Sequence, residues 1–348
     1  MNLDFSLLEG GYLRDLLDEP RVLEQTLAGL QASAALSDFA RDLERGRFRR
    51  VVLTGMGGSF DALHPLYFAL NRSGFTTLMV ETSELIHTVP EVVGEGTLLV
   101  ILSQSGRSVE MLRLLDMRGS TPVIAITNYA EADLAKRADA VVLTQAGVEF
   151  SVSSKTYVAS LLALQWLRGI LCTRDRSRVP DELRAAPSAA AAYLKNWKDH
   201  VGALFAEMRD VKDVFLLGRG DSLATARTGG LILKESTKYH AEGMSSAAFR
   251  HGPFEMVAPG VYTLVFEGEG AGAALNRGLV EDVRKAGGGG ALVSPQAQMD
   301  AYRVPGPWSL ATPILEILPV QMLSLALAAR ANREPGKFRW ITKVTTVE

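Results

Sequence analysis

A serine-rich hexapeptide is the feature of this sequence best suited to bind a phosphate group. Residues 103–108 read Ser-Gln-Ser-Gly-Arg-Ser, and they follow an apolar run at 98–102. Three hydroxyls, an amide and a glycine at the start of a helix would offer a phosphate monoester several neutral donors together with the helix dipole. The alternative is an ordinary helix N-cap, because serine is common there. The strand before the loop favours a ligand site, since open α/β sheets bind ligands at the carboxyl ends of their strands.

Glycine-rich turns occur in both halves of the chain. Residues 51–59 read VVLTGMGGS and residues 214–222 read VFLLGRGDS, so each apolar run ends in Gly-x-Gly-x-Ser. A strand, a glycine turn and a serine before a helix expose backbone N–H groups to an anion. The repeat predicts two related α/β units that handle a phosphorylated small molecule, with Ser59, Ser153 and Ser154 as further donors. Neither turn has the full spacing of a dinucleotide-binding loop, so NAD is not expected.

Three titratable side chains could carry proton transfer or covalent chemistry. Glu235 lies near the end of a helical run, where a carboxylate could move a proton between adjacent sugar carbons or simply be solvated beside Lys234. His251, in the sequence RHGP, could shuttle a proton to a ring oxygen or have no function. Lys343 could attack a ketone as a Schiff-base nucleophile or be a surface lysine. Spacing alone does not decide among these alternatives.

The composition is that of a globular protein with no strong charge bias. The 348 residues suffice for two α/β domains, and the 37 basic and 39 acidic side chains nearly cancel, so no nucleic-acid partner is expected. The N-terminus lacks the basic segment of a signal peptide and no apolar run is long enough to span a membrane, so we expect a cytoplasmic protein. Cys172, the single cysteine, is expected to be a small hydrophobe rather than a catalytic thiol. No metal or cofactor is expected.

The hydrophobic pattern predicts alternating strands and helices in both halves. Apolar runs without alternation are typical of parallel strands buried on both faces, and we expect such strands at 51–54, 77–81, 97–102, 122–127, 140–143, 214–217, 262–266 and 291–293. Helical periodicity predicts amphipathic helices over 12–47, with a break at 18–20, and further helices at 60–72, 108–116, 156–171, 189–208, 223–239, 274–286 and 314–329. The glycine run 287–290 is expected to be a turn rather than a phosphate loop.

Taken in order along the chain, these motifs resemble the sugar isomerase (SIS) family, and more closely the isomerase half of the glucosamine-6-phosphate synthases. The motifs that carry the resemblance are GMGGS at 55–59, SQSG at 103–106, AGVE…S at 146–154, LGRGDS at 217–222, LKE at 233–235, HAE at 240–242, HGP at 251–253 and VTTVE at 344–348. The resemblance implies an α/β protein with two tandem SIS domains, each a flavodoxin-like parallel sheet flanked by helices. The expected divisions are N-terminal helices at 1–48, a first SIS domain at 49–175, a linker at 176–195, a second SIS domain at 196–331 and a tail at 332–348 that contributes to the active site.

The resemblance also implies roles for individual residues. The residues that would hold a sugar 6-phosphate are Ser59, Ser103, Gln104, Ser105 and Ser108, with help from Ser154, and those that would otherwise contact the substrate are Gly57, Gly58, Glu149 and Val152. Glu235 corresponds to the family's base for proton transfer between C1 and C2, and Lys343 to the lysine that forms an imine with the ketose. His251 corresponds to the ring-opening histidine, which a neighbouring subunit lends. The resemblance therefore implies a homodimer with its active site at the subunit interface.

Three departures from the synthases bear on the expected activity. Ile232 stands where the synthases have a lysine, Arg107 replaces an acidic residue, and the sequence contains no glutaminase domain, so glutamine-dependent synthesis is not expected of this polypeptide alone. We expect an enzyme that acts on an amino-sugar or fructosamine 6-phosphate as a deaminase, deglycase or isomerase. The alternative is a non-catalytic sugar-phosphate sensor that regulates a partner protein, which would not need to keep the three titratable residues together.

Overall fold

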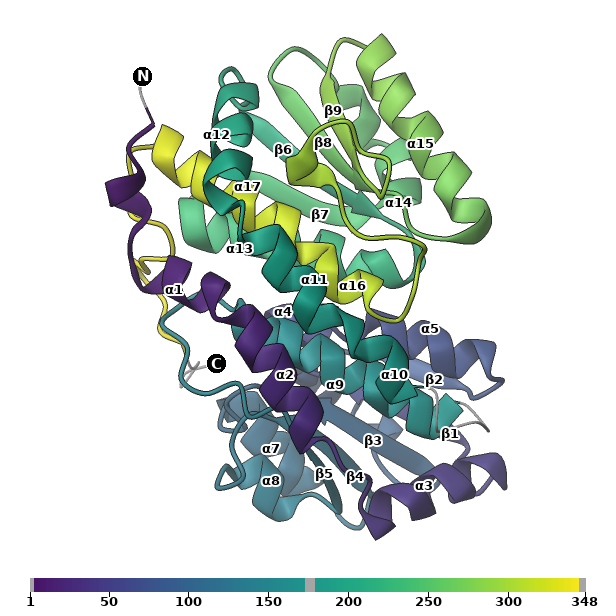
Figure 1. The fold of residues 1–348 in the computed structure, drawn as a ribbon. Helices are drawn as coiled ribbons and strands as arrows, with labels where there is room; N and C mark the ends of the chain where they lie inside the picture. Colours follow the sequence, from purple (N-terminus) through teal and green to yellow (C-terminus); the bar gives the residue numbers. More distant parts are fainter. Residues whose placement is uncertain (1–2, 173–178, 344–348) are drawn as a thin grey trace. The chain divides into compact units, whose positions relative to one another are not determined.

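The computed structural model of the protein describes residues 3–172 and 179–343, and the closing VTTVE motif lies outside this part. The chain divides into two compact units, each built around one parallel sheet (Figure 1). The first-sheet unit comprises residues 21–148, 155–184 and 341–348. The second-sheet unit comprises residues 1–20, 149–154 and 185–340.

The first sheet has five parallel strands in the order β2-β1-β3-β4-β5. The strands are β1 (Arg50–Thr54), β2 (Thr77–Met79), β3 (Thr97–Leu102), β4 (Val123–Thr127) and β5 (Ala140–Leu143). Every residue of the central strand β3 is buried, as its uninterrupted apolar run predicts for a strand covered on both faces. The strand order is that of flavodoxin-like folds, in which ligands bind where the order reverses, between β1 and β3.

Helices cover both faces of the first sheet. They are α2 (Glu19–Gly29), which begins just before the division between units, α3 (Ala34–Glu44), α4 (Gly57–Asp61), α5 (His64–Arg72), α6 (Thr82–His87), α7 (Val109–Met117), α8 (Asp133–Arg137), α9 (Lys155–Cys172) and α10 (Val179–Leu183), with a 3-10 turn at Pro90–Val92. Alternate sheet residues such as Leu99 and Ile101 pack with Leu114 of α7 and Leu134 of α8 on one face. Helix α9 packs against β4, α3 and α5.

The second sheet has four parallel strands in the order β7-β6-β8-β9, which repeats the first four positions of the first sheet. The strands are β6 (Asp213–Gly218), β7 (Ala241–Ser245), β8 (Val261–Phe266) and β9 (Gly289–Val293). Strand β7 was not expected from the sequence, because its residues AEGMS have no apolar run. Its pairing to β6 keeps Gly243 close to the backbone of α13, where an added Cβ would lie 2.1 Å from Ala226 O.

The helices of the second-sheet unit include a long apolar core helix, α17. They are α1 (Gly11–Leu17), α11 (Ala185–Leu194), α12 (Trp197–Glu207), α13 (Leu223–Thr237), α14 (Ser246–Arg250), α15 (Gly270–Lys285), α16 (Thr312–Leu315) and α17 (Ile317–Arg330), with 3-10 turns at Phe5–Leu8, Gly220–Ser222, Pro253–Met256 and Asp300–Tyr302. The stretch Thr312–Arg330 has the length and mean hydropathy of a membrane span, but its whole window is buried inside the protein. It packs against α12 and α13, as a core helix does.

The expected fold class is confirmed, while several elements differ from the expected ones. The expected strand 77–81 ends at Met79, and the expected helices 60–72 and 189–208 are each two helices. Helices α6 and α8 were missed because each is too short to show helical periodicity. The range 176–195, expected to be a linker, contains α10 and the whole of α11, whose alanine-rich sequence favours a helix.

Candidate functional site

The serine-rich loop connects β3 to α7, and two of its serine hydroxyls accept hydrogen bonds from the loop's own backbone. Ser103 Oγ accepts a hydrogen bond from Gly106 N at 3.2 Å, and Ser105 Oγ accepts one from Arg107 N at 3.2 Å. Because both oxygens act as acceptors in these bonds, each hydroxyl keeps its hydrogen for a further acceptor. Ser108 is the N-cap residue of α7, yet within the described chain its side chain makes no capping hydrogen bond. The loop therefore fits an anion-binding site better than a simple cap.

Gly106 gives the loop its shape. Its φ of +61° lies in the left-handed region that side chains rarely adopt. A Cβ at this position would also lie 2.7 Å from Ala132 Cβ and 2.9 Å from Thr127 Oγ1. The glycine therefore lets the chain turn tightly against the residues after β4, so that the serines stand at the carboxyl end of the sheet.

A small cavity of about 140 Å³ lies at this edge of the first sheet. Its lining is formed by Gly55, Met56, Ser59, Thr82, Ile101, Leu102, Ser103, Gln104, Ser105, Ser108, Met111 and Lys343. Five of these residues are the phosphate-binding candidates of the sequence, and the sixth candidate, Ser154, belongs to the other unit. Gly57 and Gly58 begin helix α4 beside Ser59, and Gly57 has a φ of +52°. The structure thus brings residues from four separate segments to one hydroxyl-rich cavity.

Lys343 is the only charged side chain among the described residues that line this cavity. It is half-buried and comes from the C-terminal tail, far in sequence from the serine loop. A cavity with several hydroxyl donors and one ammonium group suits a phosphate dianion. The same primary amine, shielded from water, is also suited to attack a carbonyl carbon.

The loop Glu149–Ser154 belongs to the second-sheet unit and is largely buried. Glu149 is 6% exposed, and its Oε1 accepts hydrogen bonds from Ser154 N at 2.9 Å and Ser154 Oγ at 3.1 Å. Val152 is completely enclosed. In this arrangement the Ser154 hydroxyl donates to a carboxylate, so its role as a phosphate donor stays a prediction.

Glu235 and His251 lie on different elements of the second-sheet unit. Glu235 stands near the C-terminal end of α13 and is half-buried, and its backbone carbonyl accepts a hydrogen bond from Lys238 Nζ. His251 follows α14 as its C-cap residue, is exposed, and donates its backbone N–H to Ala248 O at 3.0 Å. An exposed histidine is compatible with a role in a subunit interface, which stays a prediction.

A buried polar network near Glu235 was missed by the sequence reasoning. Tyr12 Oη and Ser324 Oγ are 3.0 Å apart, and Gln321 Nε2 donates to Glu19 Oε1 at 2.5 Å. Burial raises the pKa of Tyr12 above its ordinary value, and the negative charges of Glu19, Glu149 and Glu235 raise it further. Burial also raises the pKa of Glu19 well above its ordinary value. About 300 residues separate the two sides of this network, which is why no sequence spacing could indicate it.

The second Gly-x-Gly-x-Ser turn is not an anion site of the kind that the repeat predicted. Ser222 Oγ donates to Glu316 Oε1 at 2.9 Å, and Glu316 is 1% exposed. Asp221 in the same turn is also buried. Carboxyl groups at the end of β6 disfavour the binding of a phosphate. The two turns therefore share a glycine-rich sequence after a strand, but they do not share the side chains that would bind an anion.

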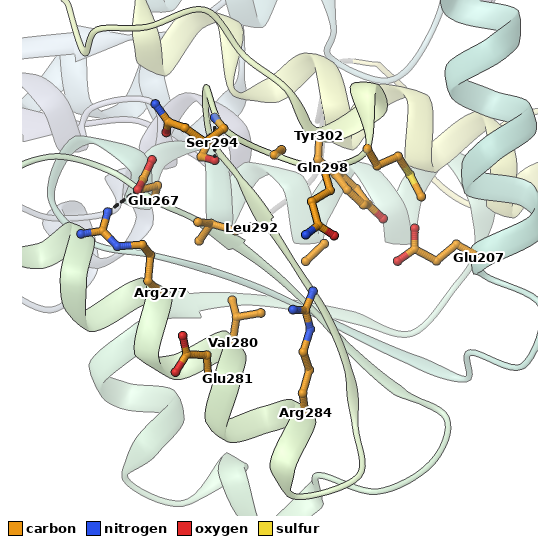
Figure 2. Close-up of a pocket in the computed structure, with 14 residues that line it drawn as sticks. Glu207, Glu267, Arg277, Val280, Glu281, Arg284, Leu292, Ser294, Gln298 and Tyr302 are labelled. Carbon is orange, nitrogen blue, oxygen red and sulfur yellow. Dashed lines mark hydrogen bonds and ion pairs between the residues drawn. The ribbon is translucent and has the colours of Figure 1, made fainter.

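A cavity of about 590 Å³ in the second-sheet unit lies beside α15 and β9 (Figure 2). Arg277 pairs with Glu267 at one side of it, and Arg284 projects from α15 toward Gln298. At the other side Tyr262 Oη donates to Glu207. This mixture of charges was not expected from the sequence, because its members come from segments between residues 207 and 302.

In the part of the chain that the structure describes, neither a metal centre nor a reactive thiol is found outside these cavities. Within the described residues, no group of three or more His, Cys, Asp or Glu side chains is placed to hold a metal ion. Burial raises the pKa of the Cys172 thiol, which makes it a poorer nucleophile at neutral pH.

Comparison with known proteins places these observations in a family. Residues 47–167 and 207–292 match the SIS domain family. The chain is 30% identical to the glutamine–fructose-6-phosphate aminotransferase (isomerizing) of Pyrobaculum aerophilum over 98% of its own length, but it spans only 58% of that relative. Its fold is similar to the C-terminal domain of glucosamine-fructose-6-phosphate aminotransferase from Francisella tularensis, with a TM-score of 0.81, 21% identity, and coverage of 94% of this chain and 98% of that one.

A second solved structure shares the fold over nearly the whole chain. This is the glucosamine-6-phosphate deaminase from Thermotoga maritima, with a TM-score of 0.77, 19% identity, and coverage of 97% of this chain and all of that one. At these identities the structural likeness establishes the fold, while the family match covers more than half of the sequence and includes both glycine turns. The chain therefore belongs to the SIS domain family.

Proposed function

We propose that this protein is a phosphosugar enzyme that acts on an amino-sugar or fructosamine 6-phosphate. The observation that carries the proposal is that Lys343 lines the same cavity as Ser59 and the Ser103–Ser108 loop. Hydroxyl donors would bind the phosphate, and the amine would lie within the same enclosure as the bound sugar. A deaminase among the solved structures of similar fold supports an activity of this class.

The proposed chemistry begins with ring opening, which gives the open-chain form of the sugar. His251 would protonate the ring oxygen as the ring opens, lent by a neighbouring subunit of a homodimer. With an amine at C2, Glu235 would then take the proton from C2 and return it to C1, which gives a ketose imine. Water adds to C2 and ammonia leaves, so that glucosamine 6-phosphate and water yield fructose 6-phosphate and ammonia. For a fructosamine 6-phosphate, Glu235 would move a proton from C1 to C2, which gives an imine at C1. Water adds to C1 and the amine leaves, so that the fructosamine 6-phosphate and water yield an aldose 6-phosphate and the amine.

Lys343 would contribute in one of two ways. As an ammonium ion it would balance the charge of the phosphate, and as a free amine it would form an imine with a ketose at C2, with loss of water. Ile232 is fully buried in α13, so the cation that the synthases carry at this position is absent from the described site. We therefore assign the proton transfer between C1 and C2 to Glu235 alone.

The test combines product release with isotope exchange. The unaltered protein is incubated with glucosamine 6-phosphate, and separately with fructosamine 6-phosphates, in deuterated water, and released ammonia or amine is measured together with deuterium at C1 and C2. We expect release or exchange with at least one substrate, and loss of both in Glu235→Gln. Glu242→Gln, an altered carboxylate on neighbouring β7, is the matched control.

Two further measurements separate the alternatives. Saturable binding of hexose 6-phosphates without exchange would contradict the enzymatic proposal and favour a sensor. Sedimentation velocity tests the proposed homodimer. A monomer with full activity would contradict the role assigned to His251 of a neighbouring subunit.

A further inference from the structure

A second small cavity, of about 200 Å³, lies at the carboxyl end of the second sheet. It is formed by the residues that follow β8 and β9 and by the connection from β9 to α16, which Figure 1 shows as a long irregular segment. The first-sheet unit has its serine-lined cavity at the corresponding edge. Ligands of open α/β sheets gather at such edges, so the position by itself suits a small molecule.

Glu316 is the buried carboxyl group among the described residues that line this cavity. It is 1% exposed and stands between α16 and α17. Its Oε1 accepts the hydrogen bond from Ser222, but its Oε2 has no hydrogen-bond partner among the described residues. A buried carboxyl oxygen without a donor costs roughly 1–3 kcal/mol, because it gives up its hydrogen bonds to water. A ligand with an N–H or O–H group would remove that cost.

The charges around the cavity exclude a phosphate. Among the described residues that line it there is no Lys, Arg or His, whereas two carboxyl groups, Glu267 and Glu316, are present. Glu267 already forms an ion pair with Arg277, as Figure 2 shows. Glu316 is therefore the carboxyl group that could bind a ligand in this cavity. This lining is opposite in character to the hydroxyls and Lys343 of the first-sheet cavity.

The remaining walls suit a compact organic cation. Trp308 lines the cavity, and the π-electrons of an aromatic ring attract ammonium groups. Ser294 and Thr312 add hydroxyl oxygens, and the prolines of the connection add apolar surface. A primary ammonium ion has three hydrogens to donate, which matches one carboxyl oxygen and two hydroxyls.

We propose that this cavity is a second ligand site that binds a small primary ammonium compound against Glu316 and Trp308. The site is separate from the proposed sugar-phosphate chemistry and does not depend on it. Its occupant is defined by charge and size: a cation of a few non-hydrogen atoms, rather than an anion or a neutral polyol.

The test compares three probes of similar size on the full chain. Ethanolamine, ethylene glycol and glycolate are titrated by calorimetry at constant ionic strength and about pH 8.5, where Glu316, whose pKa burial raises to about 8, is mostly ionised and ethanolamine still carries its charge. We expect saturable binding of ethanolamine, binding of ethylene glycol at least tenfold weaker, and no binding of glycolate. Equal binding of ethanolamine and ethylene glycol, or no saturation by ethanolamine, would overturn the proposal.

Substitutions then locate the binding. Glu316→Gln keeps an oxygen for Ser222 and removes the charge, so ethanolamine should bind at least tenfold more weakly. Glu255→Gln, at an exposed carboxylate that does not line the cavity, should bind as the unaltered chain does. Unchanged binding in Glu316→Gln would show that this carboxyl is purely structural and would refute the site.

A second variant guards against loss of folding. If Glu316→Gln does not fold, Trp308→Ala at the partly exposed wall should weaken ethanolamine binding at least fivefold, and unchanged binding would again refute the site. Ser105→Ala, which alters the first-sheet cavity, should leave ethanolamine binding unchanged. Failure of this proposal and failure of the proposed function are therefore distinguishable.

Discussion

Glu149 accepts two hydrogen bonds from Ser154, one from its backbone nitrogen at 2.9 Å and one from its hydroxyl at 3.1 Å. Both residues are buried, and the pair closes the loop that immediately precedes α9 in the chain. A carboxylate that receives two donors from one serine fixes that loop. This relationship gives Ser154 a structural role besides the phosphate-binding role that the family resemblance implies.

Removing the Ser154 hydroxyl separates these two roles. We expect Ser154→Ala to lower the free energy of unfolding by about 1–3 kcal/mol, because the buried Glu149 loses a donor. Chemical denaturation measures this loss, and the KM for the sugar phosphate should change less than it does in Ser105→Ala. A large rise in KM with unchanged stability would instead favour direct phosphate binding by Ser154.

Ser105→Ala tests the phosphate loop. A hydrogen bond to a charged group is worth about 1.5–3 kcal/mol, so affinity for a hexose 6-phosphate should fall roughly 10- to 100-fold. Calorimetric titration measures this, with Ser120→Ala at an exposed turn of the same unit as control. Equal affinities for the two variants would remove Ser105 from the site.

Lys343 can be tested for charge and nucleophilicity separately. Lys343→Arg keeps the charge but cannot form an imine, whereas Lys343→Met loses both. With fructose 6-phosphate and borohydride, we expect mass spectrometry to find a trapped adduct on Lys343, which Lys343→Arg abolishes while keeping phosphate binding. Lys343→Met should also weaken phosphate binding, and Lys136→Met, at an exposed lysine of α8, should change neither property. An adduct in Lys343→Arg would show that another amine reacts.

Restoring the lysine of the synthases at position 232 should destabilise this protein. Ile232 is 1% exposed, and a lysine there would bury an ammonium group without a designed partner. We expect Ile232→Lys to lower the free energy of unfolding by several kcal/mol, and the volume-conserving Ile232→Met to cost less than about 1.5 kcal/mol. Denaturation curves that coincide for these two variants would contradict this prediction, because they would show that the buried position 232 tolerates a lysine ammonium group.

Glu316 should make stability fall as pH rises. Burial raises its pKa from 4.5 to about 8 in the folded protein, with the charge of Asp221 adding to the shift and the hydrogen bond from Ser222 opposing it. Between these two pKa values the folded state holds a proton that the unfolded state has released, so this carboxyl lowers stability by up to about 1.4 kcal/mol per pH unit. The unaltered chain should therefore lose stability relative to Glu316→Gln as the pH rises from 5 to 8, which a comparison of their unfolding free energies measures. A constant difference would mean that Glu316 is ionised throughout this range.

The α/β class could be predicted from the amino-acid pattern alone, and so could the position of the serine-rich loop after a buried strand. Buried parallel strands such as β3 are uninterrupted apolar runs, and the glycine and serines of 103–108 follow one directly, so local pattern and chemistry coincide. The strand β7 and the short helices α6 and α8 escaped prediction. Their residues form these elements because the neighbouring strand or helix supplies the hydrogen bonds and packing, which no local pattern records.

Only the tertiary structure decided which distant residues share a cavity. Lys343 joins Ser59 and the serine loop because the tail returns to the carboxyl end of the first sheet, and Glu316 meets Ser222 because α17 packs against α13. The two glycine turns are alike in sequence, yet one is lined by hydroxyls and a lysine and the other by buried carboxyl groups. A local motif fixes the backbone of a turn, while the charges that face it come from elements far along the chain.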